Sequence, residues 1–261
     1  MNFKDKLKKV IVEIKNNLSY KYDFYYDGKL KLLFNLFGIK TKSINARMFS
    51  QFNQDLIVKQ ILETNFKINL NYSGQDVRIV DIGANHPIDY NNTYLFEKLY
   101  GAKVYSFEPN KNLEREWIKY RSESQIQYVG ISDEAKTLSL NIPEINNSNN
   151  DDSHDPNMFA SFSESTIEKK SSIYNKLVVD VKPLENVLEK GNYDVLFIDV
   201  EGHEMHVLKG IDFDGFSFKV IVIENNSEVG GSDLIRKYLI SRGYQLHSRL
   251  YHLDDIFIKS N

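Results

Sequence analysis

The stretch Arg78-Ile-Val-Asp-Ile-Gly-Ala-Asn85 decides how the rest of the chain is interpreted. Its apolar residues suit a buried strand, and Gly83 lets the chain turn tightly and approach a ligand without a Cβ in the way. A helical pattern begins near Asn92, so strand, glycine turn and helix follow one another as in the first unit of a nucleotide-binding α/β sheet. Asp81 is then expected at the carboxyl end of the strand, where ligands bind in such sheets.

The next apolar run, Val104-Tyr-Ser-Phe-Glu-Pro-Asn110, ends in a second acid, Glu108. A carboxylate at this point can bind both hydroxyls of a ribose. The dinucleotide fingerprint G-x-G-x-x-G is incomplete, because Gly83 is its one glycine. Asp81 and Glu108 therefore suit a ligand with a ribose and a cationic end, such as S-adenosylmethionine, better than one with two phosphates. The alternative is that both are solvated acids at strand ends.

Five motifs carry a resemblance to a known family. In chain order they are SQFNQD (50–55), VDIGAN (80–85), NNTYLFEKLYGAKVYSFEPN (91–110), GISD (130–133) and FIDVEGHEMHVLKG (197–210). Together they resemble the FkbM family of S-adenosylmethionine-dependent O-methyltransferases, over about residues 48 to 258. The resemblance implies an α/β class I (Rossmann-like) methyltransferase fold, in which a mostly parallel seven-stranded sheet ends in an antiparallel edge hairpin.

The resemblance also implies cofactor contacts that the residues alone leave open. Gln51 and Asp55 would lie beside the methionine end of the cofactor; otherwise they are surface residues at a helix start, with Ser50 as the expected N-cap. Ser132 and Asp133 would face the adenine; otherwise they mark a change from strand to turn. The cofactor-binding residues expected are Asp81, Gly83, Asn85, Glu108, Ser132, Asp133, Gln51 and Asp55.

A second motif with reactive side chains follows the buried strand predicted at 195–198. Asp199, Glu201 and His203 alternate, which would place them on one face if the extended conformation persisted. Methyl transfer requires an aligned acceptor oxygen and removal of its proton, and a histidine of ordinary pKa, about 6.5, is mostly neutral at pH 7. We therefore expect His203 to be the general base, with Glu201 or Asp199 orienting it or the acceptor. A partly exposed helix start is one alternative, and a divalent cation bound by these residues is another that is not favoured, so no metal is assigned.

The acceptor is expected at the same edge of the sheet. Glu224 and Asn225 end an apolar strand and, with Asn92, are assigned to substrate binding. The last two predicted strands, 244–250 and 256–258, form an antiparallel edge hairpin, which favours a methyltransferase over a dehydrogenase sheet.

The sequence predicts strands at 78–83, 103–108 and 126–132 that alternate with helices at 92–100 and 111–121, and later a strand at 177–181 and a helix at 232–242. Trp117 is assigned to core packing. The alternation stops in an insertion at about 141–176. Its run 146–155 is polar and predicts a loop, while 159–163 could form a short strand or an ordered lid. An insertion here would lie above the carboxyl end of the sheet, where an acceptor enters. A solvated loop is favoured over a metal site for its acidic residues and histidine, which are Asp151, Asp152, His154 and Asp155.

The N-terminal part of the chain differs from the rest. Residues 1–45 contain ten lysines against four acids, with apolar residues at helical spacing, and predict a basic helical arm ahead of a methyltransferase domain at 46–261. The arm could pack on the domain or on a partner in a homodimer, contact an anionic membrane surface, or be mobile. The whole chain, of 261 residues, has a net charge of -3 and no cysteine, which gives no argument for nucleic acid as a partner and excludes thiolate chemistry.

These observations predict a cytoplasmic S-adenosylmethionine-dependent O-methyltransferase. Its acceptor would be a hydroxyl of a sugar, including a nucleotide-sugar, or of another small polar metabolite. The family resemblance implies glycan or secondary-metabolite tailoring, and the Lys- and Asn-rich composition favours capsule or surface-glycan biosynthesis in a low-GC bacterium. The alternatives are an NAD-dependent sugar oxidoreductase and a non-enzymatic nucleotide-binding protein.

Overall fold

The computed structural model describes residues 49–70, 76–122, 124–143, 159–162, 174–226 and 232–260. The predicted basic arm at 1–45 lies outside these residues, as do the acidic loop at 146–155 and much of the rest of the insertion. Within the described ranges no helix combines the length and the hydropathy needed to span a membrane.

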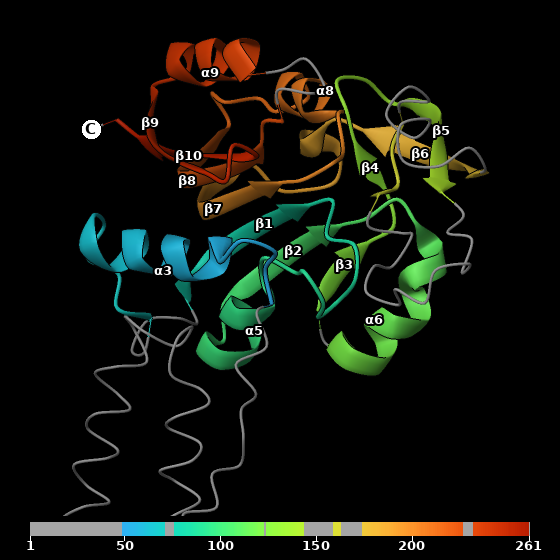
Figure 1. Ribbon diagram of the computed structural model, residues 1–261, viewed down its shortest axis with the longest axis horizontal. Helices are drawn as coiled ribbons and strands as arrows, with labels where there is room; N and C mark the ends of the chain where they lie inside the picture. The colour runs from blue at the N-terminus through green and yellow to red at the C-terminus, as the bar shows by residue number, and fades with distance from the viewer. Residues whose placement is uncertain are drawn as a thin grey trace, which may run out of the picture. The chain divides into compact units, whose positions relative to one another are not determined.

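A seven-stranded sheet forms the centre of the domain, as the sequence predicted (Figure 1). Its strands, in spatial order, are β3 (Gln125–Gln127), β2 (Lys103–Phe107), β1 (Arg78–Ile82), β7 (Gly191–Ile198), β8 (Phe216–Glu224), β10 (Asp254–Lys259) and β9 (Tyr244–Leu250). The first five strands are parallel, and β10 runs antiparallel to both β8 and β9. The strand order reverses between β1 and β7, which creates a crevice at their carboxyl ends.

Helices cover both faces of this sheet (Figure 1). The helices are α3 (Gln54–Thr64), α5 (Tyr94–Tyr100), α6 (Glu114–Arg121), α8 (Glu204–Lys209) and α9 (Ser232–Ser241), with short 3-10 helices η2 (Lys111–Leu113) and η4 (Leu184–Asn186). In Figure 1, α3, α5 and α6 lie on one side of the sheet and α8 and α9 on the other. The predicted helices at 92–100, 111–121 and 232–242 are thus confirmed with small shifts of their ends.

Strand β7 shows why the sheet needs two apolar layers. Val195 and Phe197 pack in the cluster that contains apolar residues of α3 and α5, whereas Leu196 and Ile198 pack in the cluster that contains those of α8 and α9. Successive side chains of a strand point to opposite faces, so a strand buried on both sides reads as a continuous apolar run. Asp199, one residue beyond the strand, continues the face of Val195 and Phe197.

A second, three-stranded sheet corrects one prediction. The expected strand at 126–132 is in fact two strands, because the chain leaves the main sheet after β3 and enters the second sheet as β4 (Gly130–Ile131). There β4 pairs in parallel with β6 (Tyr174–Lys182), which pairs antiparallel with β5 (Lys136–Pro143). The strand predicted at 177–181 is confirmed as part of β6, whereas β5 was not predicted.

The start of α3 also differs from the prediction. Asn53, not Ser50, is the N-cap residue, and its left-handed backbone (φ 62°) makes no side-chain cap. The Ser50 hydroxyl instead donates to Oδ1 of Asp55 at 2.6 Å. Its Oγ also accepts from the backbone N–H of Asp55 at 3.5 Å, so Ser50 contacts the first turn of α3 without being its N-cap residue.

Candidate active site

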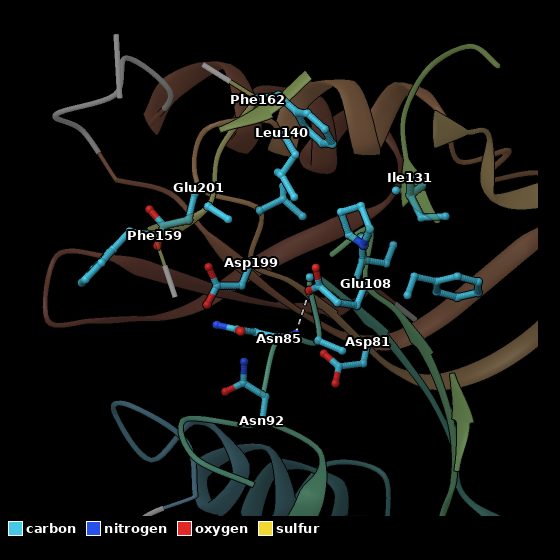
Figure 2. Close-up of a pocket in the computed structure, with 18 of the residues that line it drawn as sticks. Asp81, Asn85, Asn92, Glu108, Ile131, Leu140, Phe159, Phe162, Asp199 and Glu201 are labelled. Carbon is cyan, nitrogen blue, oxygen red and sulfur yellow. Dashed lines mark hydrogen bonds between the residues drawn. The ribbon is translucent and has the colours of Figure 1, made fainter. Parts of the chain in front are cut away.

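A cavity opens at the carboxyl ends of β1, β2 and β7, where the strand order reverses (Figure 2). Ligands of open α/β sheets bind at such a switch point. The residues that line the cavity are Gln51, Asp81, Ile82, Gly83, Ala84, Asn85, Tyr90, Asn92, Phe107, Glu108, Pro109, Gly130, Ile131, Leu140, Phe159, Ala160, Phe162, Asp199, Val200 and Glu201.

Gly83 forms the floor of this cavity and tolerates no side chain. Its φ is 84°, in the left-handed region, and a Cβ there would lie 1.8 Å from the backbone oxygen of Asp199. The Gly83 N–H donates to the Phe107 carbonyl at 2.9 Å, and the Asp199 N–H donates to the Ile82 carbonyl at 3.0 Å. The glycine turn is therefore held between the ends of β2 and β7.

Glu108 is fixed at the end of β2 by the backbone. Its two carboxylate oxygens accept from the N–H of Asn85 at 2.9 Å and from the N–H of Asn110 at 2.7 Å. Burial raises the pKa of this carboxyl to about 7, although both hydrogen bonds favour the ionised form. A carboxylate has about four lone-pair positions, so two remain for hydroxyl donors in the cavity.

Asp81 is held at the end of β1 by the start of α5. The Thr93 hydroxyl donates to Oδ2 of Asp81 at 2.8 Å. Burial raises the pKa of Asp81 to about 6, while Thr93 and the Arg121 guanidinium oppose that rise. The Asn91 side chain positions the same turn, because its Oδ1 accepts from the backbone N–H of Thr93 at 3.0 Å and of Tyr94 at 2.8 Å. Asn91, Thr93 and Arg121 were not predicted from the sequence, although an Asn two or three residues before a helix is a common capping signal.

Two asparagines place unpaired amide oxygens in the site. Oδ1 of Asn85 and Oδ1 of Asn92 are buried and accept no hydrogen bond from any described residue. Both residues line the cavity, and Figure 2 shows the Asn92 amide pointing up toward Asn85 and Asp199. The Asn85 carbonyl accepts from Nε1 of Trp117 at 2.8 Å, so Trp117, expected only as a core residue, also supports the glycine loop.

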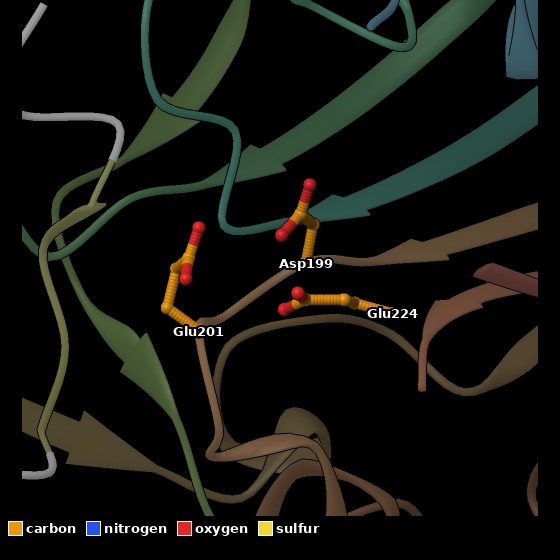
Figure 3. Close-up of side chains that lie close together, drawn as sticks. All are labelled: Asp199, Glu201 and Glu224. Carbon is orange, nitrogen blue, oxygen red and sulfur yellow. The ribbon is translucent and has the colours of Figure 1, made fainter. Parts of the chain in front are cut away.

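Three carboxylates form an acid cluster at the opposite side of the cavity, and two of them, Asp199 and Glu201, line it. One oxygen each from Asp199, Glu201 and Glu224 lies within 4.8 Å of the others, and Figure 3 shows the side chains directed toward one another. The sheet register explains this, because Ile198 of β7 pairs with Ile223 of β8 and the next residues of the two strands are Asp199 and Glu224.

The predicted grouping of Asp199, Glu201 and His203 on one face is wrong. Glu201 has φ 52° and Gly202 has φ 101°, so the extended conformation ends there. Glu224 lies beside Asp199 and Glu201 instead.

His203 lies behind the cavity wall. Its Nε2 is 3.0 Å from the Ser132 hydroxyl, its ring stacks on His206 with centroids 4.5 Å apart, and it is not among the lining residues. Burial, followed by the neighbouring His206, lowers the pKa of His203 to about 4. Asp133 contacts Nδ1 of His206 at 3.0 Å. Ser132 and Asp133 thus engage the two histidines, and the cavity is lined by their neighbours in β4.

Two carboxyls of the acid cluster, Asp199 and Glu224, are harder to ionise than ordinary carboxyls. Burial first, and then neighbouring carboxylates, raise the pKa of Asp199 and of Glu224 well above the usual range. Neither side chain accepts a hydrogen bond or forms an ion pair with any described residue. Oε2 of Glu224 is fully shielded from solvent as well.

Glu204, at the first position of α8, holds the turn that carries Glu201. Its Oε1 accepts from the N–H of Gly202 at 3.0 Å and from the N–H of Val200 at 3.3 Å. The sequence analysis missed this role. A glutamate in the first turn of the predicted helix was the signal for it, since such residues bind free N–H groups at helix starts.

The remaining predicted residues divide between the cavity and its surroundings. Gln51 lines the cavity, whereas Asp55 is buried against Ser50 and does not line it. Nδ2 of Asn225 donates to Asp255 at 2.6 Å, so this asparagine is fixed to β10 beside the acid cluster.

The fold and the site together define the class of the protein. A sheet that is parallel except for an antiparallel edge hairpin, with acids at the carboxyl ends of its central strands, is a class I (Rossmann-like) methyltransferase domain. Residues 81–246, more than half of the chain, match the family model of the Methyltransferase FkbM domain. The chain belongs to this family and is a methyltransferase.

Known structures give a weaker likeness. One of the similar solved structures is a proposed RNA methyltransferase from Pyrococcus horikoshii, with 10% identity, a TM-score of 0.39, and coverage of 82% of this chain and 88% of that chain. A likeness of this size adds nothing to the family assignment. No curated protein matches the chain.

Proposed function

We propose that the protein transfers the methyl group of S-adenosylmethionine to a hydroxyl oxygen of a sugar or another small polar metabolite. The observation that carries the proposal is the setting of Glu108. It is buried at the cavity, held by two backbone N–H groups, and retains acceptor positions for the two hydroxyls of a ribose.

The charge of the cavity also favours this cofactor. Asp81, Glu108, Asp199 and Glu201 line it, so a pyrophosphate would be repelled whereas a sulfonium and an ammonium group would be attracted. With the ribose at Glu108, the methionine end would lie toward Asp81, Asn85 and Gln51, and the methyl group toward the acid cluster.

Methyl transfer then needs few groups. A lone pair of the acceptor oxygen attacks the methyl carbon in line with the carbon–sulfur bond, and the electrons of that bond pass to the sulfur. The sulfonium becomes the neutral thioether of S-adenosylhomocysteine, and the hydroxyl proton passes to a carboxylate at the cavity wall, Asp199 or Glu201. These two carboxylates are better placed than His203, because both line the cavity and His203 does not.

The acceptor side supports a polyhydroxylated substrate. Asp199, Glu201 and the amide of Asn92 offer acceptors and a donor to hydroxyl groups, and the aromatic rings of Phe159 and Phe162 face the same space. A sugar or nucleotide-sugar of bacterial capsule or surface-glycan biosynthesis fits this lining and the tailoring reactions implied by the family resemblance.

Calorimetric titration of the purified chain with S-adenosylhomocysteine, and with NAD in a parallel cell, tests the cofactor. We expect binding of S-adenosylhomocysteine alone, and a loss of about ten- to a hundredfold in affinity for Glu108→Ala, since bonds to a charged acceptor contribute about 1.5–3 kcal/mol. Glu189→Gln, at an exposed position, is the matched control. Binding of NAD alone would overturn the proposal.

The acceptor class is then tested with methyl-labelled S-adenosylmethionine and a panel of nucleotide-sugars, free sugars and phenols. Label should appear in sugars as a base-stable methyl ether. Label found in a phenol instead would replace the proposed acceptor class while leaving the methyltransferase assignment in place.

A further inference from the structure

The acid cluster consists of Asp199, Glu201 and Glu224. Two of its carboxylates have no partner among the described residues to balance their negative charge. Glu224 and Asp199 have no hydrogen-bond or ion-pair partner among the described residues, and Asp199 opens into the cavity. The nearby ionisable groups with the largest influence on both are further acids, including Asp254 and Glu204. Two partly buried carboxylates without such a partner are unfavourable, because each one lost part of its hydration when the chain folded.

The spacing of these carboxylates matches the coordination sphere of a single ion. Their three oxygens lie within 4.8 Å of one another. Oxygen ligands of one ion at about 2.1–2.6 Å can be at most about 4–5 Å apart, so an ion fits between them with small side-chain movements. Figure 3 shows the three side chains approaching from the ends of two strands and from the loop after β7.

A second observation is independent of the cluster's charge. Asn92 comes from the turn before α5, on another part of the chain; the residue is 9% exposed, and its buried Oδ1 accepts no hydrogen bond from any described residue. Its side chain lines the same cavity as Asp199 and Glu201, and Figure 2 shows its amide below Asp199 with the nitrogen on the side of Asp199. Oε2 of Glu224 is likewise buried and unpaired within the described part of the chain. Buried polar atoms nearly always have a partner, so these two oxygens indicate a ligand that the described residues do not supply.

We propose that Asp199, Glu201 and Glu224 hold a hard divalent cation of the Mg²⁺, Mn²⁺ or Ca²⁺ class at the acceptor side of the cavity. Carboxylate and amide oxygens are the ligands of such ions, whereas zinc and copper sites use imidazole or thiolate groups. The site differs from the cation site considered from the sequence, because Glu224 takes the place of His203.

The role of the ion rests on the proposed methyl transfer. Bound beside the methyl group, it would take the acceptor hydroxyl as a ligand and lower the pKa of that hydroxyl. Each carboxylate uses one oxygen for the ion, which leaves the second oxygen of Asp199 or Glu201 to receive the proton. The ion would therefore align the acceptor as well as activate it.

The test uses Mn²⁺ and the full-length chain after treatment with a chelator and its removal. Electron paramagnetic resonance measures the free hexaaqua ion during titration. We expect one tight site per chain in the wild type, at least a tenfold weaker site in Glu224→Gln and in Asp199→Asn, and no change in Glu189→Gln. Mg²⁺ or Ca²⁺ should compete for it.

Two further measurements distinguish a failure of the proposed cation site from a failure of the proposed cofactor assignment. Mn²⁺ should raise the melting temperature of the wild type but not of Glu224→Gln, since only a protein with the site gains stability from the ion. S-adenosylhomocysteine affinity, measured on the same samples, should be unchanged in Glu224→Gln. Absence of a tight Mn²⁺ site in a wild-type protein that binds S-adenosylhomocysteine would overturn the cation site alone. Binding that is equally tight in Glu224→Gln would overturn it too.

Discussion

Two pairs of carboxylates end neighbouring strands of one sheet, and their surroundings differ. Asp81 and Glu108 accept hydrogen bonds from a hydroxyl and from two backbone N–H groups. Asp199 and Glu224, at the ends of the next two strands, accept none from the described residues. Asp81 and Glu108 are buried, Asp199 and Glu224 are partly buried, and burial raises the pKa of all four carboxyls.

The fold supplies hydrogen-bond donors to the pair Asp81 and Glu108, here called the first half-site, whereas the described residues supply none to Asp199 and Glu224, the second half-site. If the first half-site receives the cofactor as proposed, its geometry exists beforehand and little ordering is needed on binding. Around Asp199 and Glu224 the chain lowers its own stability by grouping acids. Functional sites commonly lower stability in this way, because groups matched to a ligand or transition state are mismatched without it.

The largest expected effect comes from Gly83, which joins the two half-sites. Gly83→Ala should lower the free energy of unfolding by about 3–5 kcal/mol, because the new Cβ would meet the Asp199 carbonyl at 1.8 Å. Gly243 is a matched control with nearly the same φ, 83°, and a Cβ there would meet no atom of the described residues within 4 Å. Gly243→Ala should cost only about 1–2 kcal/mol of conformational strain. Equal losses in chemical denaturation would show that close packing at Gly83 is unimportant.

Asp199→Asn should remove activity without removing the cofactor. We expect methyl transfer to fall by about 10²–10⁴-fold while S-adenosylhomocysteine affinity changes by less than about threefold, since the acid acts on the acceptor. His203→Gln should cost less than about tenfold, because the ring lies outside the cavity and bonds Ser132. Single-turnover rates measure both. A larger loss for His203→Gln than for Asp199→Asn would return the role of base to His203.

Neutralising one member of each carboxylate pair should change the free energy of unfolding in opposite directions. In chelator at pH 8, Glu224→Gln should raise the free energy of unfolding by about 1–2 kcal/mol. The substitution removes a carboxylate that has neighbouring acids and no partner among the described residues. Glu108→Gln should lower the free energy of unfolding by about 1–3 kcal/mol. In the wild type both carboxylate oxygens accept from a backbone N–H, whereas in the variant one of these N–H groups would face the amide nitrogen and lose its acceptor. Urea unfolding measures both. A stabilised Glu108→Gln would remove the contrast between the half-sites.

Glu204 offers a smaller test of the turn beneath Glu201. Glu204→Ala leaves the N–H groups of Val200 and Gly202 without an acceptor and should cost about 1–2 kcal/mol and part of the activity. Glu204→Gln keeps Oε1 and should restore most of both. If Glu204→Gln behaves like Glu204→Ala, the charge of Glu204 rather than its hydrogen bonds is what matters.

The smallest effect concerns pH. Glu108 must be ionised to accept from both ribose hydroxyls, and its pKa is about 7. Its ionised fraction falls about tenfold between pH 8 and pH 6, so S-adenosylhomocysteine affinity should fall by about that factor on acidification. Glu108→Gln should show a flatter profile, while Glu189→Gln should follow the wild type. Calorimetry at three pH values measures the effect, and a flat wild-type profile would contradict the assignment of the ribose to Glu108.

Much of the fold could be predicted because its strands are short, apolar and separated by clear turn signals. The runs of β1, β7 and β8 are apolar at consecutive positions, which is typical of strands covered on both faces. The break between β3 and β4 could not be predicted, because no local signal shows that a chain leaves one sheet and enters another. Strand β5 was missed because its first half alternates between exposed and half-buried residues.

The sequence by itself determined the family, the parallel order of the core and the positions of Asp81 and Glu108 at the ends of neighbouring strands, since each is encoded by a local motif. Only the tertiary structure decided which residues meet in the acid cluster. Glu224 joins Asp199 through the register of two strands, and His203 is turned away by two residues with positive φ. Register and backbone turns depend on contacts between distant segments, and no single stretch of sequence specifies them.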